Sequence, residues 1–114
     1  MAIISFAMTT GAFLDYRKTV TRRFWNRAYA ERWQKWYDEG KVFHQAYDKL
    51  PRNGGQQIGS LRLTCRPYWE QLGDMPESDL EAEGGYWASI EEFIEALGKT
   101  PEDEAFVIRF EKVD

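Results

Sequence analysis

The residues best suited to chemistry lie together in one short segment, positions 15–23, whose sequence is Asp-Tyr-Arg-Lys-Thr-Val-Thr-Arg-Arg. This segment places Lys18 three residues before Thr21 and surrounds both with arginines. A threonine hydroxyl is a poor nucleophile unless a base removes its proton as it attacks. A lysine can act as that base only if its pKa falls well below the usual value of about 10.4, and burial and neighbouring cations both lower it. Lys18 and Thr21 are therefore candidates for a base and a nucleophile.

Short strands must position this segment. Positions 18–23 are rich in β-branched and charged residues, which is typical of a loop that runs into a strand. Apolar runs predict further strands at residues 3–7, 42–47, 58–67 and 105–110.

Helices are predicted between the strands. Aromatic residues at three- and four-residue intervals predict a helix over residues 24–39, ended by Gly40. Thr9 or Thr10 can cap a short helix that precedes it, and capping boxes begin at Ser78 and Ser89. Strands and helices in this order predict an α+β, barrel-like fold.

The composition predicts a single domain that spans residues 1–114. Apolar residues make up 43% of the chain, enough for a core, and charged residues make up 30%. No apolar run approaches the roughly 20 residues that cross a bilayer, and the start lacks the pattern of a signal peptide. Cys65 is the only cysteine, and strand alternation places it on the buried face with Leu61 and Leu63. We therefore expect a cytoplasmic protein with no membrane partner.

Charge is distributed unevenly. Lys and Arg outnumber Asp and Glu by 12 to 5 in residues 1–69, whereas residues 70–114 hold 3 basic and 14 acidic residues. A basic half can form a face for an anionic ligand. Alternatively, the two halves neutralise each other in the folded chain.

Positions 15–23 resemble the signature of the ASCH domain, in which a Lys-Thr segment followed by Thr and Arg comes just after the first helix. The surrounding order fits as well, with Ile58-Gly59 in a mid-chain strand, Glu83-Gly84 in an acidic helix and a last strand similar to Phe-x-Ile-x-Phe. The resemblance covers nearly the whole chain. It implies a PUA-like small β-barrel with inserted helices. The tryptophan-rich segment after Arg23 is longer than in the smallest members of the family.

The resemblance also implies a site. Small members of the family look like amidohydrolases that remove the acetyl group of 4-acetylcytidine, with a working set of Lys, Thr and Glu. The matching positions are Lys18, Thr21 and Glu83, and Glu81 is the alternative carboxylate. In that strand, one of Arg22 and Arg23 would face the pocket or bind phosphate, because adjacent strand residues point to opposite faces.

Several other side chains are candidates for binding or for metal ligation. Ligand-binding candidates are Arg17, Arg22, Arg23, Trp69 and Trp87, the two tryptophans because they lie outside the helical periodicity of the others. Trp25, Trp33 and Trp36 have helical spacing that favours core packing. His44 is the only histidine and has no cysteine nearby, which argues against a zinc site. We expect no metal and no cofactor.

Two functions of different class remain open at this stage. In the first, the domain recognises RNA or a modified nucleoside in a cleft lined by Lys18, Thr21 and Glu83, without catalysis. In the second, it is an amidohydrolase that deacylates 4-acetylcytidine-like nucleosides, with Thr21 as nucleophile and Lys18 as base. A purely structural interpretation also stands, in which Lys18 and Glu83 form a salt bridge and Thr21 is a strand residue. The sequence predicts no oligomeric state.

Overall fold

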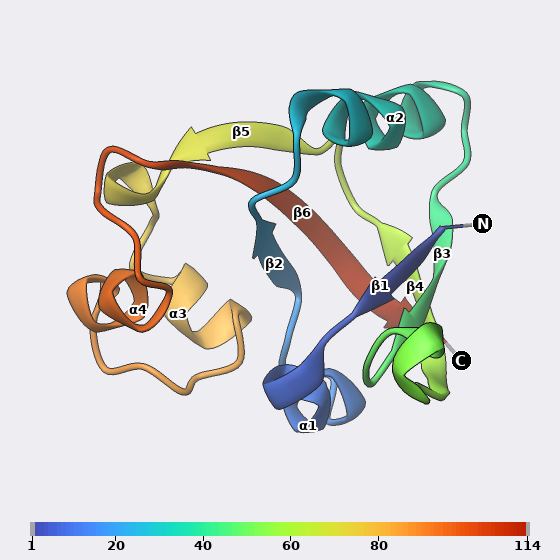
Figure 1. Ribbon diagram of the computed structural model, residues 1–114, viewed down its shortest axis with the longest axis horizontal. Coiled ribbons are helices and arrows are strands. Elements are labelled where there is room, and N and C mark those ends of the chain that lie inside the picture. The colour runs from blue at the N-terminus through green and yellow to red at the C-terminus, as the bar shows by residue number, and fades with distance from the viewer. Residues whose placement is uncertain (1, 114) are drawn as a thin grey trace.

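The longest strand, β6 (Glu104–Val113), is the centre of the sheet and crosses the molecule diagonally (Figure 1). The computed structural model describes residues 2–113. Six strands form the sheet in the order β1-β3-β4-β6-β2, and β5 also pairs with β6. The remaining strands are β1 (Ile3–Ser5), β2 (Val20–Arg23), β3 (Phe43–Tyr47), β4 (Gln57–Leu63) and β5 (Tyr68–Gln71).

β6 occupies the centre because its side chains are apolar on both faces. Residues 105–108 are all fully buried, as expected for a strand covered on each side. β2, β4 and β5 all run antiparallel to β6, whereas β1 is parallel to β3. The predicted α+β class is confirmed, and the chain uses its closing strand to hold β2, which carries Thr21, in place.

The sheet does not close into the barrel that the sequence predicts. β1 and β2 are the two ends of this strand order, and no backbone pairing joins them among residues 2–113. β1 has only three residues, and the chain turns directly after it into the 3-10 helix Ala7–Thr9. A side chain bridges the gap instead, because Arg23 Nη2 donates a hydrogen bond to the Ser5 carbonyl oxygen at 2.7 Å.

Four α-helices lie against the sheet: α1 (Thr10–Leu14), α2 (Arg27–Asp38), α3 (Asp79–Ala82) and α4 (Ile90–Ala96). α2 begins later than residue 24 because the Asn26 side chain accepts the Tyr29 N–H and caps it. Gly40, with φ 79°, follows its end as predicted. No helix in the described part of the chain has both the length and the apolar character needed to cross a membrane.

The predicted caps are correct for one helix and wrong for two. The Ser89 hydroxyl accepts the Glu92 N–H and caps α4. The Ser78 side chain makes no capping bond at α3. The hydroxyls of Thr9 and Thr10 donate backwards to carbonyl oxygens three residues earlier, so neither caps α1. Local hydrogen bonds of this kind compete with capping.

The predicted strand over residues 58–67 is interrupted. β4 ends at Leu63 and β5 begins at Tyr68, and the two pair with successive parts of β6. Cys65 lies in the bend between them and is only half-buried, so the prediction of a buried thiol is wrong. Strand alternation could not place it because the strand has already ended.

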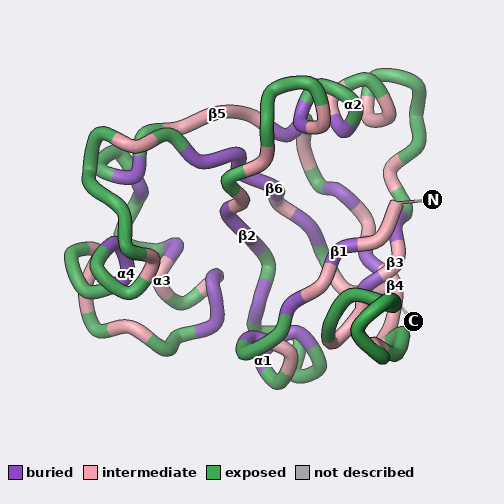
Figure 2. Tube along the Cα trace, in the orientation of Figure 1, coloured by how far each residue is buried: buried purple, intermediate pink, exposed green. Residues whose placement is uncertain are grey.

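Two apolar clusters hold the fold together. The larger joins the sheet to α1 and α2, where Trp33 is fully buried and Trp25 and Trp36 pack against it, as their helical spacing predicted. The smaller lies under α4 and joins Phe93 and Ile94 to Leu72, Met75 and Ala105. α3 and α4 lie on the side of β2 opposite to β1 and β3 (Figure 1), and buried segments from both groups face β2 (Figure 2).

Candidate functional site

Lys18 is placed by the turn that ends α1. Tyr16 adopts a φ of 64°, and the N–H groups of Arg17 and Lys18 both donate to the carbonyl oxygen of Ala12. This turn sends Lys18 into the interior, where it is 2% exposed. Its Nζ donates to Glu83 Oε1 at 2.9 Å and to the Glu83 carbonyl oxygen at 2.8 Å.

Residues 82–84 lie directly along residues 17–19. Their three consecutive carbonyl oxygens accept hydrogen bonds from the Thr19 N–H, Lys18 Nζ and Arg17 Nη1, at 2.8 Å each. This docking brings Glu83, and not the exposed Glu81, to Lys18. The sequence leaves open whether Glu81 or Glu83 lies beside Lys18. These backbone hydrogen bonds place Glu83 there.

Gly84 allows this close approach, and we predict that alanine there disturbs the site. Its φ of 134° is open essentially only to glycine, and a Cβ would lie 2.8 Å from the Tyr86 ring. Gly84→Ala should lower the free energy of unfolding in urea by about 3 kcal/mol. The control Gly98→Ala, at φ 67° with open space around it, should cost about 1 kcal/mol. Equal losses in the two variants would contradict this account.

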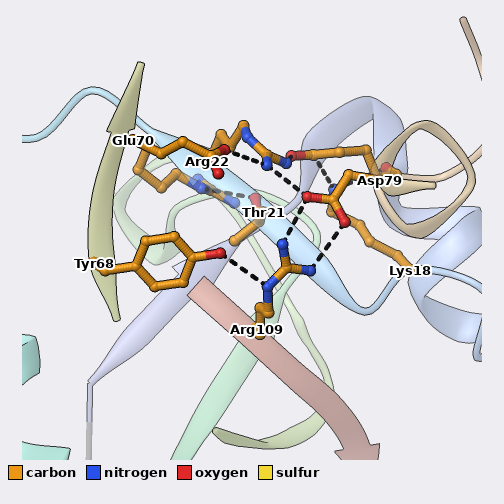
Figure 3. Close-up of polar contacts among 9 residues, drawn as sticks. Lys18, Thr21, Arg22, Tyr68, Glu70, Asp79 and Arg109 are labelled. Atoms are coloured by element: carbon orange, nitrogen blue, oxygen red, sulfur yellow. Dashed lines mark hydrogen bonds and ion pairs between the residues drawn. The ribbon is translucent and has the colours of Figure 1, made fainter. Parts of the chain in front are cut away.

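Arg22 holds the other side of the Glu83 carboxylate. Its side chain is 1% exposed, and its Nη1 donates to Glu83 Oε2 at 3.0 Å. Its Nη2 donates to Glu70 at 2.8 Å and to Asp79 at 2.6 Å, so three carboxylates surround one guanidinium (Figure 3). The Nε of Arg22 is buried without a hydrogen-bond partner. The charge of Arg22 is therefore matched by protein carboxylates.

Asp79 extends the network to the central strand. Arg109 of β6 donates from both of its terminal nitrogens to the two Asp79 oxygens, at 2.9 and 2.7 Å. Its Nε donates to the Tyr68 hydroxyl at 3.1 Å (Figure 3). Bidentate pairs of this kind are strong and fix geometry. The network thus ties α3, which precedes Glu83, to β2, β5 and β6.

Electrostatics at Lys18 favour the neutral amine more than usual. Burial lowers the pKa of Lys18, and the charges of Arg22 and Arg23 lower it further. The Glu83 carboxylate opposes this shift without cancelling it. The combined effect keeps the pKa of Lys18 below its ordinary value, in the direction that a general base requires.

Thr21 lies on β2 and is 4% exposed. Its Oγ accepts a hydrogen bond from Arg23 Nε at 3.1 Å, so its own proton is not used in that contact. Among the hydrogen bonds of residues 2–113, none joins Lys18 Nζ to the Thr21 hydroxyl. Both groups line the same space.

That space is a cleft of about 320 Å³, called here the Lys18 cleft, within the range of small-ligand sites. Its polar wall consists of Lys18, Thr21, Arg22, Arg23 and Glu83. Its apolar wall includes Phe6, Met8, Phe24, Trp87, Phe93 and Leu97. Buried polar residues from segment 15–23 and the buried Glu83 thus line one cavity beside aromatic rings.

Two predicted ligand-binding residues do not line this cleft. Trp69 packs against Phe106, and the Arg27 guanidinium lies 4.3 Å over its ring. Arg17 is half-exposed and binds the Gly84 carbonyl, so it supports the segment that carries Glu83. Trp87, by contrast, is part of the apolar wall.

The sequence did not indicate the rest of the network. In the sequence, Asp79 is only the second residue of the capping box predicted at Ser78, and Glu70 and Arg109 carry no local signal. Each lies on a different element, and only the pairing of β2 and β5 with β6 brings them together. Two basic residues of the first half, Lys18 and Arg22, pair with carboxylates of the second half. The first half therefore does not present a wholly free basic face.

The described residues contain no group of three or more His, Cys, Asp or Glu side chains that could hold a metal ion. His44 is buried, its Nδ1 accepts the Ala2 N–H at 3.2 Å, and its Nε2 lies 3.1 Å from the Lys41 carbonyl oxygen. These contacts engage both ring nitrogens within the protein.

Searches of known protein families and of curated proteins returned no match to this sequence. Among solved structures, the fold is similar to that of protein EF3133 from Enterococcus faecalis V583, described as a member of family DUF984. The two share 18% sequence identity with a TM-score of 0.57, over 96% of this chain and 74% of the other. The similarity is one of fold: the small α+β arrangement occurs in a second protein whose sequence is largely different.

Proposed function

We propose that the chain is a single ASCH-type domain that binds a modified nucleoside in the Lys18 cleft. The observation that carries the proposal is the convergence of Lys18, Thr21 and Glu83 on one cavity beside the Trp87 ring. A carboxylate can accept hydrogen bonds from donors on the edge of a base, and an ammonium beside it can donate to acceptors on the same edge. The aromatic wall offers a surface for stacking. Sequence-specific recognition of RNA likewise relies on unstacked bases held in this way.

The shape of the site favours a single nucleoside over a long RNA strand. A groove for single-stranded RNA would be open and basic, with exposed aromatic side chains along it. Here Lys18 and Arg22 are buried and paired with Glu83, so few phosphates could contact them. A recognised RNA would have to present one splayed base to the cleft.

Amidohydrolysis is the second candidate function, and the geometry of Lys18 favours it. In the neutral amine the two N–H groups can keep their bonds to the Glu83 carbonyl and carboxylate oxygens, and the lone pair is left free. That lone pair could accept the Thr21 proton as the hydroxyl oxygen attacks an acyl carbon. The Arg23 N–H on the Thr21 oxygen would stabilise the negative charge that develops there. The Lys18 ammonium would return that proton to the exocyclic nitrogen of the cytosine as the amide C–N bond breaks, so that cytidine leaves as a neutral amine. Thr21 would then carry the acetyl group as an ester until water attacks it and releases acetate.

The first experiment is a hydrolysis and binding assay with 4-acetylcytidine. Either candidate function predicts binding of this nucleoside. The amidohydrolase also predicts turnover, with kcat/KM lowered in Lys18→Met by about 10²–10⁴, the usual contribution of a general base. The rate of the native chain should rise as the pH increases through the lowered pKa of Lys18, because only the neutral amine can accept a proton. The rate of Lys18→Met should not show this rise with pH.

Lys35→Met is the matched control, because Lys35 is exposed on α2 and should not affect the rate. Circular dichroism establishes that each variant is folded. If 4-acetylcytidine binds without turnover, recognition without catalysis is the function. If it neither binds nor reacts with the folded native chain, both candidates fail for this nucleoside class.

A further inference from the structure

Arg23 differs from the other cations of the site in having no carboxylate partner. Lys18, Arg22 and Arg109 each form an ion pair shorter than 3 Å. Among residues 2–113, no carboxylate lies within 4 Å of Arg23, whose described hydrogen bonds go to the neutral oxygens of Thr21 and Ser5. Those bonds use two of its five N–H groups. The guanidinium therefore keeps donors for a further acceptor.

Arg23 also has an unusual position, because it separates two cavities. It lines the Lys18 cleft on one side. On the other it lines a cavity of about 220 Å³, called here the Trp25 cleft, together with Ile3, Ile4, Trp25, Tyr29 and Leu50. Both clefts meet at the seam between β1 and β2, where the Arg23 side chain replaces backbone pairing. A ligand in either cavity can reach the guanidinium.

Cationic side chains outnumber carboxylates in the group of residues that includes Arg23. The site contains four cations, Lys18, Arg22, Arg23 and Arg109, and three carboxylates, Glu70, Asp79 and Glu83. Burial lowers the pKa of Arg23 to about 10, and the more distant carboxylate of Glu83 opposes this shift without cancelling it. A buried cation without a counter-ion is costly, and an anion placed against it would remove that cost.

We propose that Arg23 is the anchor for a phosphate group of the ligand, bound at the seam between the Lys18 and Trp25 clefts. The planar guanidinium suits the bidentate recognition of phosphate oxygens. Given the proposed nucleoside function, the ligand is then a nucleotide, whose base enters the Lys18 cleft while its phosphate contacts Arg23. The phosphate site itself does not depend on that function.

Inorganic phosphate is the first probe, used in a titration of the native chain followed by NMR of side-chain N–H groups. We expect the Arg23 Nε–H and the Trp25 indole N–H to shift together and to saturate, and the shifts to weaken with added salt. No saturable shift at Arg23 up to tens of millimolar phosphate would overturn the proposal.

Cytidine and cytidine 5′-monophosphate are the second pair of probes, compared by calorimetry. The monophosphate should bind at least tenfold more tightly than cytidine, and Arg23→Met should remove this ratio. The control Arg62→Met, at an exposed arginine paired with Glu111, should preserve it. If Arg23→Met is unfolded, Arg23→Lys replaces it and should reduce the ratio, because an ammonium lacks the bidentate fork.

The two proposals fail in different ways. Saturable phosphate binding at Arg23 without any cytidine binding would support the anion site and contradict the nucleoside function. Cytidine and its monophosphate binding equally, with no phosphate shift at Arg23, would overturn the anion site while the nucleoside function stands.

Discussion

Replacing Asp79 with asparagine should lower the free energy of unfolding by about 3–5 kcal/mol, the usual cost of removing one partner from a buried ion pair. Its carboxylate is 5% exposed and binds two guanidiniums, Arg22 at 2.6 Å and Arg109 at 2.7 and 2.9 Å. The asparagine amide keeps the size of the side chain but not its charge. Arg109 would then lose the carboxylate of its described ion pair, whereas Arg22 would keep Glu70 and Glu83.

Asp38→Asn is the matched control. Asp38 also binds an arginine with both oxygens, Arg66 at 3.0 and 3.2 Å, but about half of each side chain is exposed. Water screens exposed pairs, so this variant should lose far less stability in urea denaturation. If Asp79→Asn and Asp38→Asn lose similar amounts of unfolding free energy, burial of the ion-pair network does not increase its contribution to stability.

Lowering the pH should reduce the free energy of unfolding through the same residue, Asp79. Burial alone would raise the pKa of Asp79, but hydrogen bonds from Arg109 and Arg22 outweigh it and hold the pKa below the ordinary value. A carboxyl with a lowered folded-state pKa contributes stability above its unfolded pKa, and this contribution is lost as the pH falls through the folded value. The unfolding free energy of Asp79→Asn should therefore depend less on pH in the acid range than that of the native chain.

Replacing Thr21 with valine should abolish hydrolysis of 4-acetylcytidine, lowering kcat by at least about 10⁴ if Thr21 is the nucleophile. Valine has nearly the same shape, so the buried position on β2 stays filled. Only the hydroxyl, and with it the acceptor of the Arg23 Nε–H, is lost. Thr21→Ser keeps a hydroxyl and should retain measurable turnover.

Thr19→Val provides the control for this substitution. Thr19 is two residues away and exposed, and its described hydrogen bonds use only the backbone, which valine keeps. The assay is release of cytidine from 4-acetylcytidine, with thermal unfolding as the check on folding. Full activity in Thr21→Val would exclude Thr21 as the nucleophile and leave Lys18 and Glu83 as residues that bind the base.

Local patterns in the sequence were enough to predict most of the elements. The aromatic spacing of α2 reflects one buried helix face, and the apolar run of β6 reflects a strand that is buried on both faces. Both patterns are local, so the sequence reports them directly. The interruption between Leu63 and Tyr68 was missed because the bend residues are themselves compatible with a strand. The open sheet was missed because closure depends on distant pairing between β1 and β2, on which local sequence carries no information.

The candidate site could be predicted only in part, for a similar reason. Lys18 and Thr21 are close in the sequence, so their spacing was visible, and Glu83 was suggested by resemblance. The contacts of Asp79, Glu70 and Arg109 depend on how three strands and α3 meet. The local sequence also could not show which arginine, Arg22 or Arg23, forms ion pairs. The answer depends on the positions that these carboxylates take in the fold.

The position of β6 in the chain has a consequence for how the protein is made. β6 pairs with β2, β4 and β5, yet residues 104–113 are synthesised after all three of those strands. On the ribosome, β2 and β5 must therefore wait unpaired, with their apolar side chains exposed, until β6 emerges. Contacts over such long sequence separations form slowly. We expect nascent chains that lack β6 to be bound by chaperones and to be sensitive to proteases, and to become resistant once this strand has been released.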